Sequence, residues 1–360
     1  MSRSTLLIAM SGGVDSSVAA YLMQQSGYDC IGAMMRLYDS RMFDEECSGS
    51  TCCDLDAAED ARSVANRLGM PFYVFNFSGA FREKVMDSFV HSYESGDTPN
   101  PCIQCNRYLK FDLFLKRALE LGCSHVVTGH YARIRQDENT GRYLLYKAAD
   151  LTKDQSYFLS CLTQQQLSHT IFPLGEMEKT AVRRIAQDQG FINARKRDSQ
   201  DICFVPDGDY MAFLERYTRK HYPDGDFLDL TGKVVGKHRG AVAYTLGQRK
   251  GLGLAMGEPV YVCGKNMEKN TVTVGPNDAL MQKTLMAKDW VWYPFQALTE
   301  PIHIKAKARS RMLEQPATAY PMDNGFVRVE FDKPQRAITP GQAVVLYDGD
   351  MVVGGGTITE

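Results

Sequence analysis

A glycine-rich turn near the start of the chain restricts the fold more than any other feature of the sequence. Residues 5–10 form a short apolar run, residues 11–13 (Ser-Gly-Gly) interrupt it, and residues 16–25 have helical spacing. Glycines let a backbone approach an anion closely, and the exposed N–H groups at a helix start attract phosphate. The hydroxyls of Ser16 and Ser17 add further donors. The pattern therefore predicts a strand, a loop that cradles a pyrophosphate group, and a helix.

This loop differs from the Walker P-loop, because the Gly-Lys-Ser/Thr ending is absent. The carboxylate of Asp15 would repel a bare phosphate, so we expect it to hold Mg²⁺ or to orient the loop. The alternative is a plain strand-to-helix turn that binds no ligand.

The strand-and-helix cycle repeats through the first half of the chain. Apolar runs at residues 30–35, 71–77 and 123–128 alternate with helical spacing at residues 55–68 and 111–121. Strands that alternate with helices indicate a parallel sheet that is covered on both faces. The fold class is therefore α/β.

The composition and the residue pattern of the sequence change at about residue 207. Gly, Pro and Asp become frequent, and Val-rich alternation replaces helical spacing at residues 242–244, 260–262 and 271–274. After Trp290, short apolar runs broken by turns suit a small β-barrel or sandwich. We therefore expect an α/β domain over residues 1–206, a small central α+β linking domain over 207–282 and a C-terminal β-barrel over 283–360.

Composition excludes several classes of protein. The 360 residues carry 41 Lys and Arg against 43 Asp and Glu, a formal net charge of −2, which argues against a uniformly basic nucleic-acid coat but allows a local basic patch. The sequence has no apolar run of about 18 residues and no signal-peptide pattern, so we expect a cytoplasmic protein without a membrane partner. Ten cysteines are too sparse for a disulfide scaffold, so their positions matter more than their number.

Three cysteines stand out by position. Cys102 and Cys105 form a Cys-x-x-Cys pair flanked by Pro and polar residues, whereas Cys203 lies between Ile202 and Phe204 and fits a core position equally well. The pair could be redox-active, could contain an activated thiol, or could bind metal. With Cys203 as a third ligand, a [4Fe–4S] cluster would keep one open iron. Another group, Cys47, Cys52 and Cys53, fits either an exposed insertion or a metal site.

Basic residues recur every second position near residue 305. A strand would present Lys305, Lys307, Arg309 and Arg311 on one face, where they could contact RNA phosphates or form a solvated surface. Further phosphate-binding candidates are Arg195, Lys196, Arg197, Arg249 and Lys250.

The segment Ser-Gly-Gly-x-Asp-Ser resembles the signature of the pyrophosphate-loop ATPases, which split ATP between the α- and β-phosphates and adenylate a substrate. More motifs follow in order, at residues 106–111, 128–133, 153–158, 174–175 with Lys179, 245–253 and 340–342. Together they resemble the bacterial tRNA-specific 2-thiouridylases over nearly the whole chain, whereas other pyrophosphate-loop enzymes share only the first motif.

The resemblance implies ATP-dependent 2-thiolation of the wobble uridine in tRNAs for Lys, Glu and Gln. By this resemblance Cys105 is the nucleophile and Cys203 carries a persulfide, and a disulfide joins the two after sulfur transfer. ATP with Mg²⁺ would contact Ala9, Met10, Ser11, Gly12, Gly13, Val14, Asp15, Ser16, Met35 and Gly129. The resemblance also implies a cysteine desulfurase or a sulfur-relay protein as the persulfide donor.

The resemblance also implies a set of tRNA contacts: Asn100, Pro101, Cys102, His130, Lys153, Asp154, Gln155, Arg309, Ser310 and Gln342. Two positions depart from the family pattern. Cys102 stands where the family often has Asp, which leaves open a cluster ligand or a resolving thiol, and Ser310 stands where it often has Tyr, which removes a stacking contact. His130 could touch RNA or simply cap the end of the sheet.

Two other functions compete with tRNA thiolation. A small-molecule ATP-dependent synthetase would share the first motif but would have no use for the paired cysteines or the basic strand. A non-catalytic nucleotide- or RNA-binding module would release no pyrophosphate.

Overall fold

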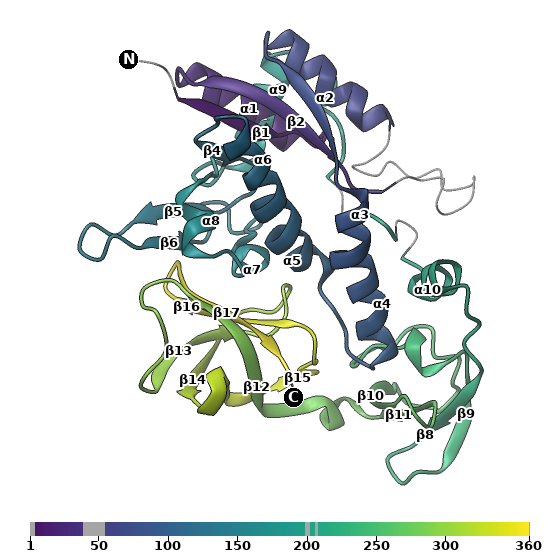
Figure 1. The fold of residues 1–360 in the computed structure, drawn as a ribbon. Helices are drawn as coiled ribbons and strands as arrows, with labels where there is room; N and C mark the ends of the chain where they lie inside the picture. Colours follow the sequence, from purple (N-terminus) through teal and green to yellow (C-terminus); the bar gives the residue numbers. More distant parts are fainter. Residues whose placement is uncertain (1–3, 39–54, 199–201, 206–207, 360) are drawn as a thin grey trace.

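The fold is that of a computed structural model, which describes residues 4–38, 55–198, 202–205 and 208–359. Cys47, Cys52 and Cys53, for which the sequence leaves an insertion or a metal site open, lie outside these residues. The described part is organised by three sheets, which occupy separate regions of the molecule (Figure 1).

The first half of the chain forms the predicted parallel sheet. Its strands lie in the order β3-β2-β1-β4-β7 and every neighbouring pair is parallel. These strands are β1 (Thr5–Ala9), β2 (Asp29–Arg36), β3 (Phe72–Asn76), β4 (His125–Val127) and β7 (Thr170–Ile171). The main helices beside the sheet are α1 (Val14–Gln25), α2 (Leu55–Arg67), α6 (Phe114–Glu120) and α9 (Lys179–Asp188).

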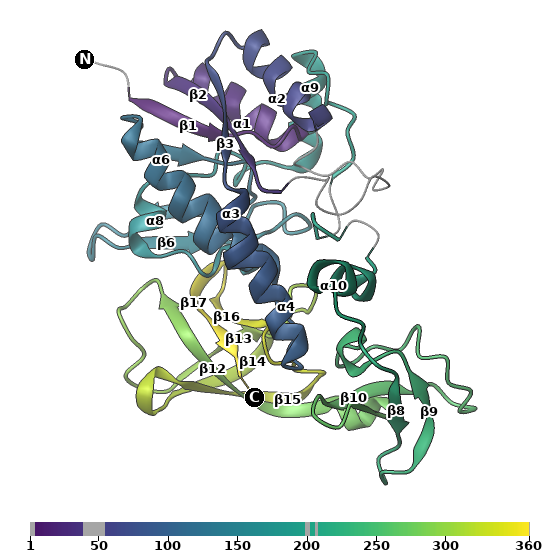
Figure 2. The ribbon, with the colours of Figure 1, turned by 45° about the vertical axis from the view of Figure 1, so that its right-hand side comes forward.

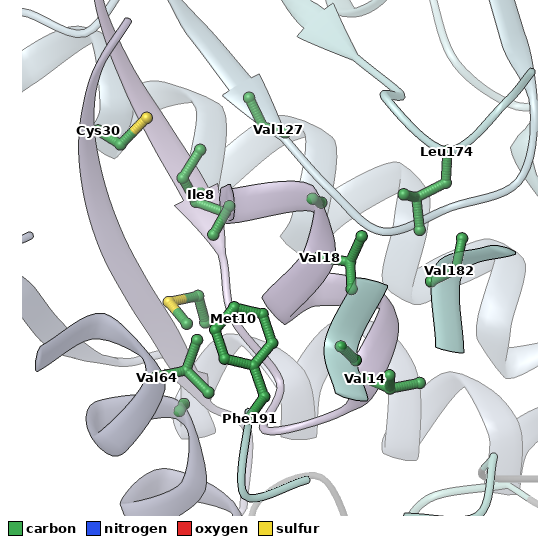
Figure 3. Close-up of a cluster of buried hydrophobic side chains, with 14 of the residues drawn as sticks. Ile8, Met10, Val14, Val18, Cys30, Val64, Val127, Leu174, Val182 and Phe191 are labelled. Atoms are coloured by element: carbon green, nitrogen blue, oxygen red, sulfur yellow. The ribbon is translucent and has the colours of Figure 1, made fainter. Parts of the chain in front are cut away.

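Alternation along β1 places apolar side chains on both faces of this sheet. Ile8 packs in one cluster with Val18 of α1 and Val182 of α9 (Figure 3). Leu7 points to the opposite face, where it packs in a cluster with Phe114 of α6. The prediction of a parallel sheet covered on both faces is confirmed.

Two long helical segments leave this sheet, and the sequence predicted only the end of one. The first consists of α3 (Ser78–Phe81), the π-helical η2 (Arg82–Met86) and α4 (Asp87–Glu94), and it runs toward the barrel and the central sheet in both views (Figures 1 and 2). The second begins with α5 (Pro101–Cys105), continues as π-helical η3 (Asn106–Leu113) and ends as α6. Two short helices follow, α7 (Ser156–Leu159) and α8 (Gln164–Ser168).

The central region combines one helix with a four-stranded sheet. The helix is α10 (Tyr210–Thr218), and the sheet has the order β10-β11-β8-β9, formed by β8 (Gly225–Leu228), β9 (Val234–His238), β10 (Tyr261–Asn266) and β11 (Thr271–Gly275). The predicted strand at residues 242–244 is wrong. Gly240, at φ 92°, turns the chain, and η4 (Ala241–Ala243) is a short 3-10 helix in which Ala241 and Val242 are buried.

The C-terminal region is the predicted β-barrel. Its strands are β12 (Met281–Trp292), β13 (Ile302–Lys307), β14 (Gln315–Pro321), β15 (Val327–Arg336), β16 (Ala343–Asp348) and β17 (Met351–Ile358). They lie in the order β12-β15-β14-β13-β16-β17, and antiparallel pairing of β12 with β17 closes the ring. Two 3-10 turns, η5 (Asn277–Leu280) and η6 (Asp323–Gly325), flank strands of this barrel.

A hairpin from the first half of the chain extends the barrel sheet. Strands β5 (Arg133–Gln136) and β6 (Tyr143–Tyr146) pair with each other, and β6 pairs with β17 at Met351 and Val352. The sequence did not predict this hairpin, whose strands are only four residues long. Backbone pairing therefore joins the N-terminal region to the barrel. Within the described ranges, no helix has both the length and the apolar character needed to cross a membrane.

Candidate active site

Serine hydrogen bonds and a close backbone contact with α2 fix the shape of the glycine-rich loop. Gly12 has φ 71°, and a Cβ at this position would collide with the Ala57 carbonyl of α2. The hydroxyls of Ser16 and Ser17 donate to the Gly13 carbonyl, at 3.0 and 3.1 Å. These bonds fix the turn just before α1, and they explain why glycine and serine are needed there.

The predicted ATP contacts gather at one edge of the parallel sheet. Residues 9–16 follow the carboxyl end of β1, Met35 lies near the end of the neighbouring β2, and Gly129 follows β4 on the other side. A Cβ on Gly129 would lie 2.7 Å from the carbonyl carbon of Asp15 and 2.8 Å from the Ser16 nitrogen. Ligands of open α/β sheets bind at this edge, so the structure brings these residues together in a suitable place.

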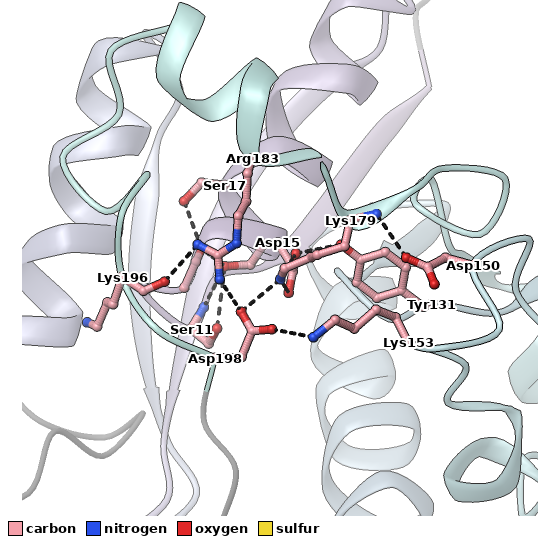
Figure 4. A network of polar contacts seen from close by, with 12 residues as sticks. Ser11, Asp15, Ser17, Tyr131, Asp150, Lys153, Lys179, Arg183, Lys196 and Asp198 are labelled. Atoms are coloured by element: carbon pink, nitrogen blue, oxygen red, sulfur yellow. Dashed lines mark hydrogen bonds and ion pairs between the residues drawn. The ribbon is translucent and has the colours of Figure 1, made fainter. Parts of the chain in front are cut away.

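A network of charged side chains adjoins the loop (Figure 4). Lys179, at the start of α9, donates to both carboxylate oxygens of Asp15, at 2.8 and 2.7 Å, and pairs with Asp198 at 2.9 Å. The Tyr131 hydroxyl also donates to Asp15, at 2.8 Å. Because both Asp15 oxygens are already bonded, the geometry favours the loop-orienting role over Mg²⁺ binding.

Asp198 binds three cations at once. Lys179 and Arg183 contact its Oδ1, at 2.9 and 2.8 Å, and Lys153 contacts its Oδ2 at 2.9 Å. Burial alone would raise the pKa of Asp198, but the hydrogen bonds from Lys153 and Lys179 outweigh it and lower the pKa below its ordinary value. Asp198 is therefore a carboxylate at neutral pH.

The phenol of Tyr131 has the opposite shift. Burial and then the charge of Asp15 raise the pKa of Tyr131 far above its ordinary value, so it remains a hydrogen-bond donor. The charge network therefore holds the Asp198 carboxylate and the neutral Tyr131 phenol beside the cations Lys153, Lys179 and Arg183.

Asn193 is a functional candidate that sequence analysis missed. Its Nδ2 donates to the Gly12 carbonyl at 3.0 Å and to the Ser17 hydroxyl at 2.9 Å, and the residue is only 2% exposed. It thus ties the chain that leads to Asp198 onto the phosphate loop. An asparagine in the segment Phe-Ile-Asn-Ala has no local sequence signal, because its partners lie about 180 residues earlier.

The cysteine pair lies on the helix that begins with α5. The side chain of Asn100 accepts from the Ile103 N–H at 3.3 Å, and Pro101 occupies the first turn, so the helix begins here. Cys102 is exposed, whereas Cys105 is buried. Cys105 packs in an apolar cluster that Cys203 also contacts.

Aromatic contacts hold the chain around Cys203. The ring of Phe204 packs against Phe81, Phe89 and Phe213, with centroids 5.6, 5.2 and 5.1 Å apart. The Tyr38 hydroxyl donates to the Cys203 carbonyl. Met35, near the carboxyl end of β2 and next to the strand that leads into the phosphate loop, packs against the same cluster. The structure therefore brings both sulfur-bearing candidates to one cluster at the edge that carries the loop.

The described cysteines do not form a metal site. Within residues 4–38, 55–198, 202–205 and 208–359, no three Cys, His, Asp or Glu side chains are grouped closely enough to hold a metal ion. The cluster of Cys102, Cys105 and Cys203 that the sequence left open therefore stays a prediction.

His130 lies in an aromatic environment next to the loop. Its ring packs between Phe111 and Phe172, with centroids 5.7 and 5.8 Å away, and its Nδ1 is 2.7 Å from the Thr128 hydroxyl. Burial, and then the charge of Lys110, lower the pKa of His130 well below its ordinary value. His130 is therefore neutral at physiological pH.

The other predicted tRNA contacts divide into two groups. In the first, Asp154 accepts from the Ala148 and Ser156 N–H groups, Gln155 accepts from the Tyr131 N–H, and Lys153 pairs with Asp198. These side chains have structural partners within the domain.

In the second group, barrel residues hold other parts of the chain. Gln342 donates to the carbonyls of Thr98 and Pro99, at 2.8 and 3.3 Å, just before α5. Arg309 donates to the Leu246 carbonyl at 3.0 Å and to the Thr339 hydroxyl. The barrel thus contacts both the loop before the cysteine helix and the central region.

The predicted basic strand is only partly correct. β13 ends at Lys307, so Lys305 and Lys307 share its outer face while Ala306 points into the barrel. Arg309, Ser310 and Arg311 follow the strand in a turn and do not continue this face. The expectation that four cations share one strand face is wrong, because β13 ends at Lys307, four residues before Arg311, and the chain then turns toward β14.

Comparisons with known proteins cover nearly the whole chain. Family models match in three consecutive parts: tRNA methyl transferase HUP domain over residues 4–207, tRNA methyl transferase PRC-barrel domain over 211–276, and Aminomethyltransferase beta-barrel domain over 282–358.

Similar proteins from three bacteria are named tRNA-specific 2-thiouridylase MnmA. The protein from Clostridioides difficile is 50% identical over 353 residues, which cover 98% of this chain and 97% of that protein. The protein from Clostridium acetobutylicum is 49% identical over 98% of this chain and 99% of its own length. That from Symbiobacterium thermophilum is 51% identical, with coverages of 98% and 91%.

Proposed function

The chain belongs to the tRNA-specific 2-thiouridylase family, and we propose that it uses ATP to replace the C2 oxygen of the wobble uridine in tRNA by sulfur. The observation that carries this proposal is the meeting of two features at one sheet edge. The phosphate loop follows β1, and the cluster shared by Cys105 and Cys203 includes Met35 of the neighbouring β2.

ATP activates the uridine in the first step. The C2 oxygen attacks the α-phosphorus, the bond to the β-phosphate breaks, and pyrophosphate leaves. The helix start at Gly13 and the cations around Asp15 offset the charge of the leaving pyrophosphate. C2 now carries an adenylate, so its oxygen can depart as AMP.

Sulfur transfer then needs two cysteines. The terminal sulfur of a Cys203 persulfide attacks C2, and AMP leaves with the original oxygen. The Cys105 thiolate attacks the Sγ of Cys203, the sulfur–sulfur bond of the persulfide breaks, and the transferred sulfur stays on C2. A Cys105–Cys203 disulfide remains, and an external dithiol must supply two electrons to restore both thiols.

An iron–sulfur route is the chemical alternative. It requires Cys102, Cys105 and Cys203 around one cluster, and the iron content of the active protein distinguishes the two routes. Anaerobically purified protein is expected to transfer sulfur without bound iron. About four irons per active chain would support the cluster.

The sulfur source is a separate protein in this proposal. We assign it to a cysteine desulfurase or a relay protein that delivers a persulfide to Cys203 in the cytoplasm, where thiols stay reduced. The tRNA contacts named above stay predictions, with Mg²⁺ entering as a complex with ATP.

The test is nucleoside mass analysis of tRNA incubated with the protein, Mg²⁺, ATP and a persulfide donor. We expect 2-thiouridine from the wild type, none from Cys203→Ser or Cys105→Ser, and normal yield from Cys263→Ser, which alters a half-buried cysteine of β10. Cys203→Ser is expected to bind tRNA normally, because phosphate contacts dominate affinity. ATP turnover that is stimulated by a small metabolite, without 2-thiouridine, would favour a synthetase.

A further inference from the structure

The barrel holds the loop that leads into the cysteine helix. The side-chain amide of Gln342, which directly precedes β16, donates to the carbonyls of Thr98 and Pro99, at 2.8 and 3.3 Å. The Thr98 N–H donates in turn to the Pro340 carbonyl, at 2.9 Å. Helix α5 begins two residues after Pro99. The barrel turn at residues 340–342 therefore fixes the backbone just ahead of the cysteine helix.

This loop and its neighbours approach each other closely. Gly341 has φ 85°, and a Cβ there would lie 3.0 Å from the Thr98 carbonyl oxygen and 3.1 Å from the Cβ of Asp97. Met267, directly after β10 of the central sheet, approaches Gly96 in the same way, because a Cβ on that glycine would lie 3.0 Å from the Met267 side chain. Both C-terminal regions therefore limit where the loop can lie.

The barrel also reaches the other end of α5, through α7. The Tyr157 hydroxyl of α7 donates to the Ala343 carbonyl at 2.9 Å, in a buried bond. The next residue, Phe158, offers its carbonyl to the side-chain amide of Asn106, at 2.9 Å. Asn106 is 2% exposed and directly follows Cys105. One short barrel segment thus supports the cysteine helix at its start and, through α7, at its end.

Cys105 lies where a helix depends on such support. The N–H groups at the start of an α-helix have no partner within the helix, so the first turn frays unless something else holds it. α5 covers only Pro101–Cys105, and the π-helical η3 begins at the next residue. In the proposed reaction the Cys105 thiolate must reach the Sγ of Cys203, and a displacement of about 1 Å can slow such a step by about a hundredfold. Contacts at the ends of α5 therefore decide how well Cys105 is placed.

We propose that Gln342 is a positioning residue for Cys105: by holding Thr98 and Pro99, it fixes the start of the cysteine helix before tRNA binds. Gln342 does not touch the reacting atoms in this scheme. The proposal rests on the proposed function, because it takes Cys105 as the thiolate that attacks Cys203. It differs from a direct tRNA contact by Gln342, since the positioning is already present in the free enzyme.

The first test measures hydrogen exchange in a peptide that covers residues 102–106, in the full-length protein without tRNA. Gln342→Ala removes both hydrogen bonds to the loop, so these amides are expected to exchange at least about threefold faster than in the wild type. Gln342→Glu keeps the size of the side chain but has no N–H to donate, so we expect at least the same increase.

The matched control for this test is Gln282→Ala, which alters an exposed glutamine of barrel strand β12 and should leave the exchange of residues 102–106 unchanged. Amides of β14 should exchange as in the wild type in all variants, which separates local release of α5 from unfolding of the barrel. Wild-type exchange of residues 102–106 in Gln342→Ala or in Gln342→Glu would overturn the proposal.

The second test separates the rate of sulfur transfer from tRNA affinity. At saturating tRNA, the single-turnover rate of 2-thiouridine formation by Gln342→Ala is expected to fall about tenfold, while its Kd for tRNA stays within about twofold of the wild-type value. A weaker Kd with a normal rate at saturation would show a tRNA contact and would contradict the positioning role. Absence of 2-thiouridine from the wild type would instead refute the proposed function, and the exchange measurement would still report on the position of α5.

Discussion

The phosphate loop and the cysteine cluster lie at the same sheet edge but are built in different ways. The turn of the loop is fixed mainly by neighbours in sequence, since Ser16 and Ser17 donate to the Gly13 carbonyl, and Asn193 adds one distant donor. The cluster is fixed by residues far apart in sequence, because Phe204 packs on Phe81 of α3, Phe89 of α4 and Phe213 of α10. Local backbone chemistry shapes the first site, and long-range apolar packing shapes the second.

This difference predicts that the two sites can be damaged separately. The largest effect is expected for Phe204→Ala, which removes a ring that is 4% exposed and costs about 3–5 kcal/mol of unfolding free energy. We expect sulfur transfer to be lost and nucleotide binding to persist at low temperature, as measured by calorimetry. The milder Phe204→Leu is the control that distinguishes loss of sulfur transfer from unfolding of the whole protein. Loss of nucleotide binding in the folded Leu variant would show that the two sites are not separable.

Gly129→Ala is expected to damage the phosphate loop and to leave the cysteine cluster unchanged. Its Cβ would press on backbone atoms of Asp15 and Ser16, which cannot move aside like a flexible side chain, so we expect a cost of about 1–3 kcal/mol. Nucleotide affinity should fall about tenfold or more, whereas the aromatic cluster should stay intact by near-UV circular dichroism. Gly79→Ala in α3, whose Cβ would meet no atom within 4 Å, is the matched control and should retain wild-type affinity. Equal affinity in both variants would contradict the close approach.

Asn193→Ala is expected to have an intermediate effect on the loop. It leaves the Gly12 carbonyl and the Ser17 hydroxyl without a buried donor, at a cost of about 1–2 kcal/mol. The expected result is nucleotide affinity lowered by about tenfold, measured at a temperature where the variant is fully folded. Gln187→Ala on the exposed side of α9 should change nothing. An unaltered affinity in Asn193→Ala would remove this residue from the site.

The smallest effect is expected from pH. The folded-state pKa of Asp198 is lowered, so its contribution to stability is present above the unfolded pKa of about 3.9 and is lost as pH falls through the folded value. The free energies of urea unfolding of wild type and Asp198→Asn should therefore differ most near pH 6, and the difference should shrink as the pH falls below the unfolded pKa of about 3.9. A gap that persists or widens in acid would mean that the carboxylate charge is not what stabilises the network.

The same contrast explains what could be predicted from sequence. The loop, its strand and its helix were predictable because one turn of residues carries the chemistry. The contact of Cys203 with the Cys105 cluster was not predictable, since the two cysteines are 98 positions apart in sequence and only the resemblance joined them. Asn193 and Asp198 were missed because their partners lie on other elements, namely the phosphate loop, α1, α9 and the turn at Lys153. The barrel was expected, but the β5–β6 hairpin that extends its sheet was not, since it comes from the first half of the chain.

The basic residues at the end of β13 show a further limit of prediction from residue spacing. Alternation of basic residues predicted one charged strand face, yet Arg309 turns toward Leu246 and Thr339 in the structure. Burial and the neighbouring Arg336 lower its pKa from the ordinary value of arginine. A regular spacing predicts a face only as far as the strand continues, and β13 ends at Lys307.

A single-turnover reaction tests the central claim most directly. Protein loaded with persulfide at Cys203 is mixed with tRNA, Mg²⁺ and ATP in the absence of reductant, and both the nucleosides and the tryptic peptides are weighed. The proposed chemistry predicts one 2-thiouridine for each new Cys105–Cys203 disulfide. Formation of 2-thiouridine without that disulfide would contradict the paired-cysteine mechanism, and release of pyrophosphate without any 2-thiouridine would contradict the proposed function.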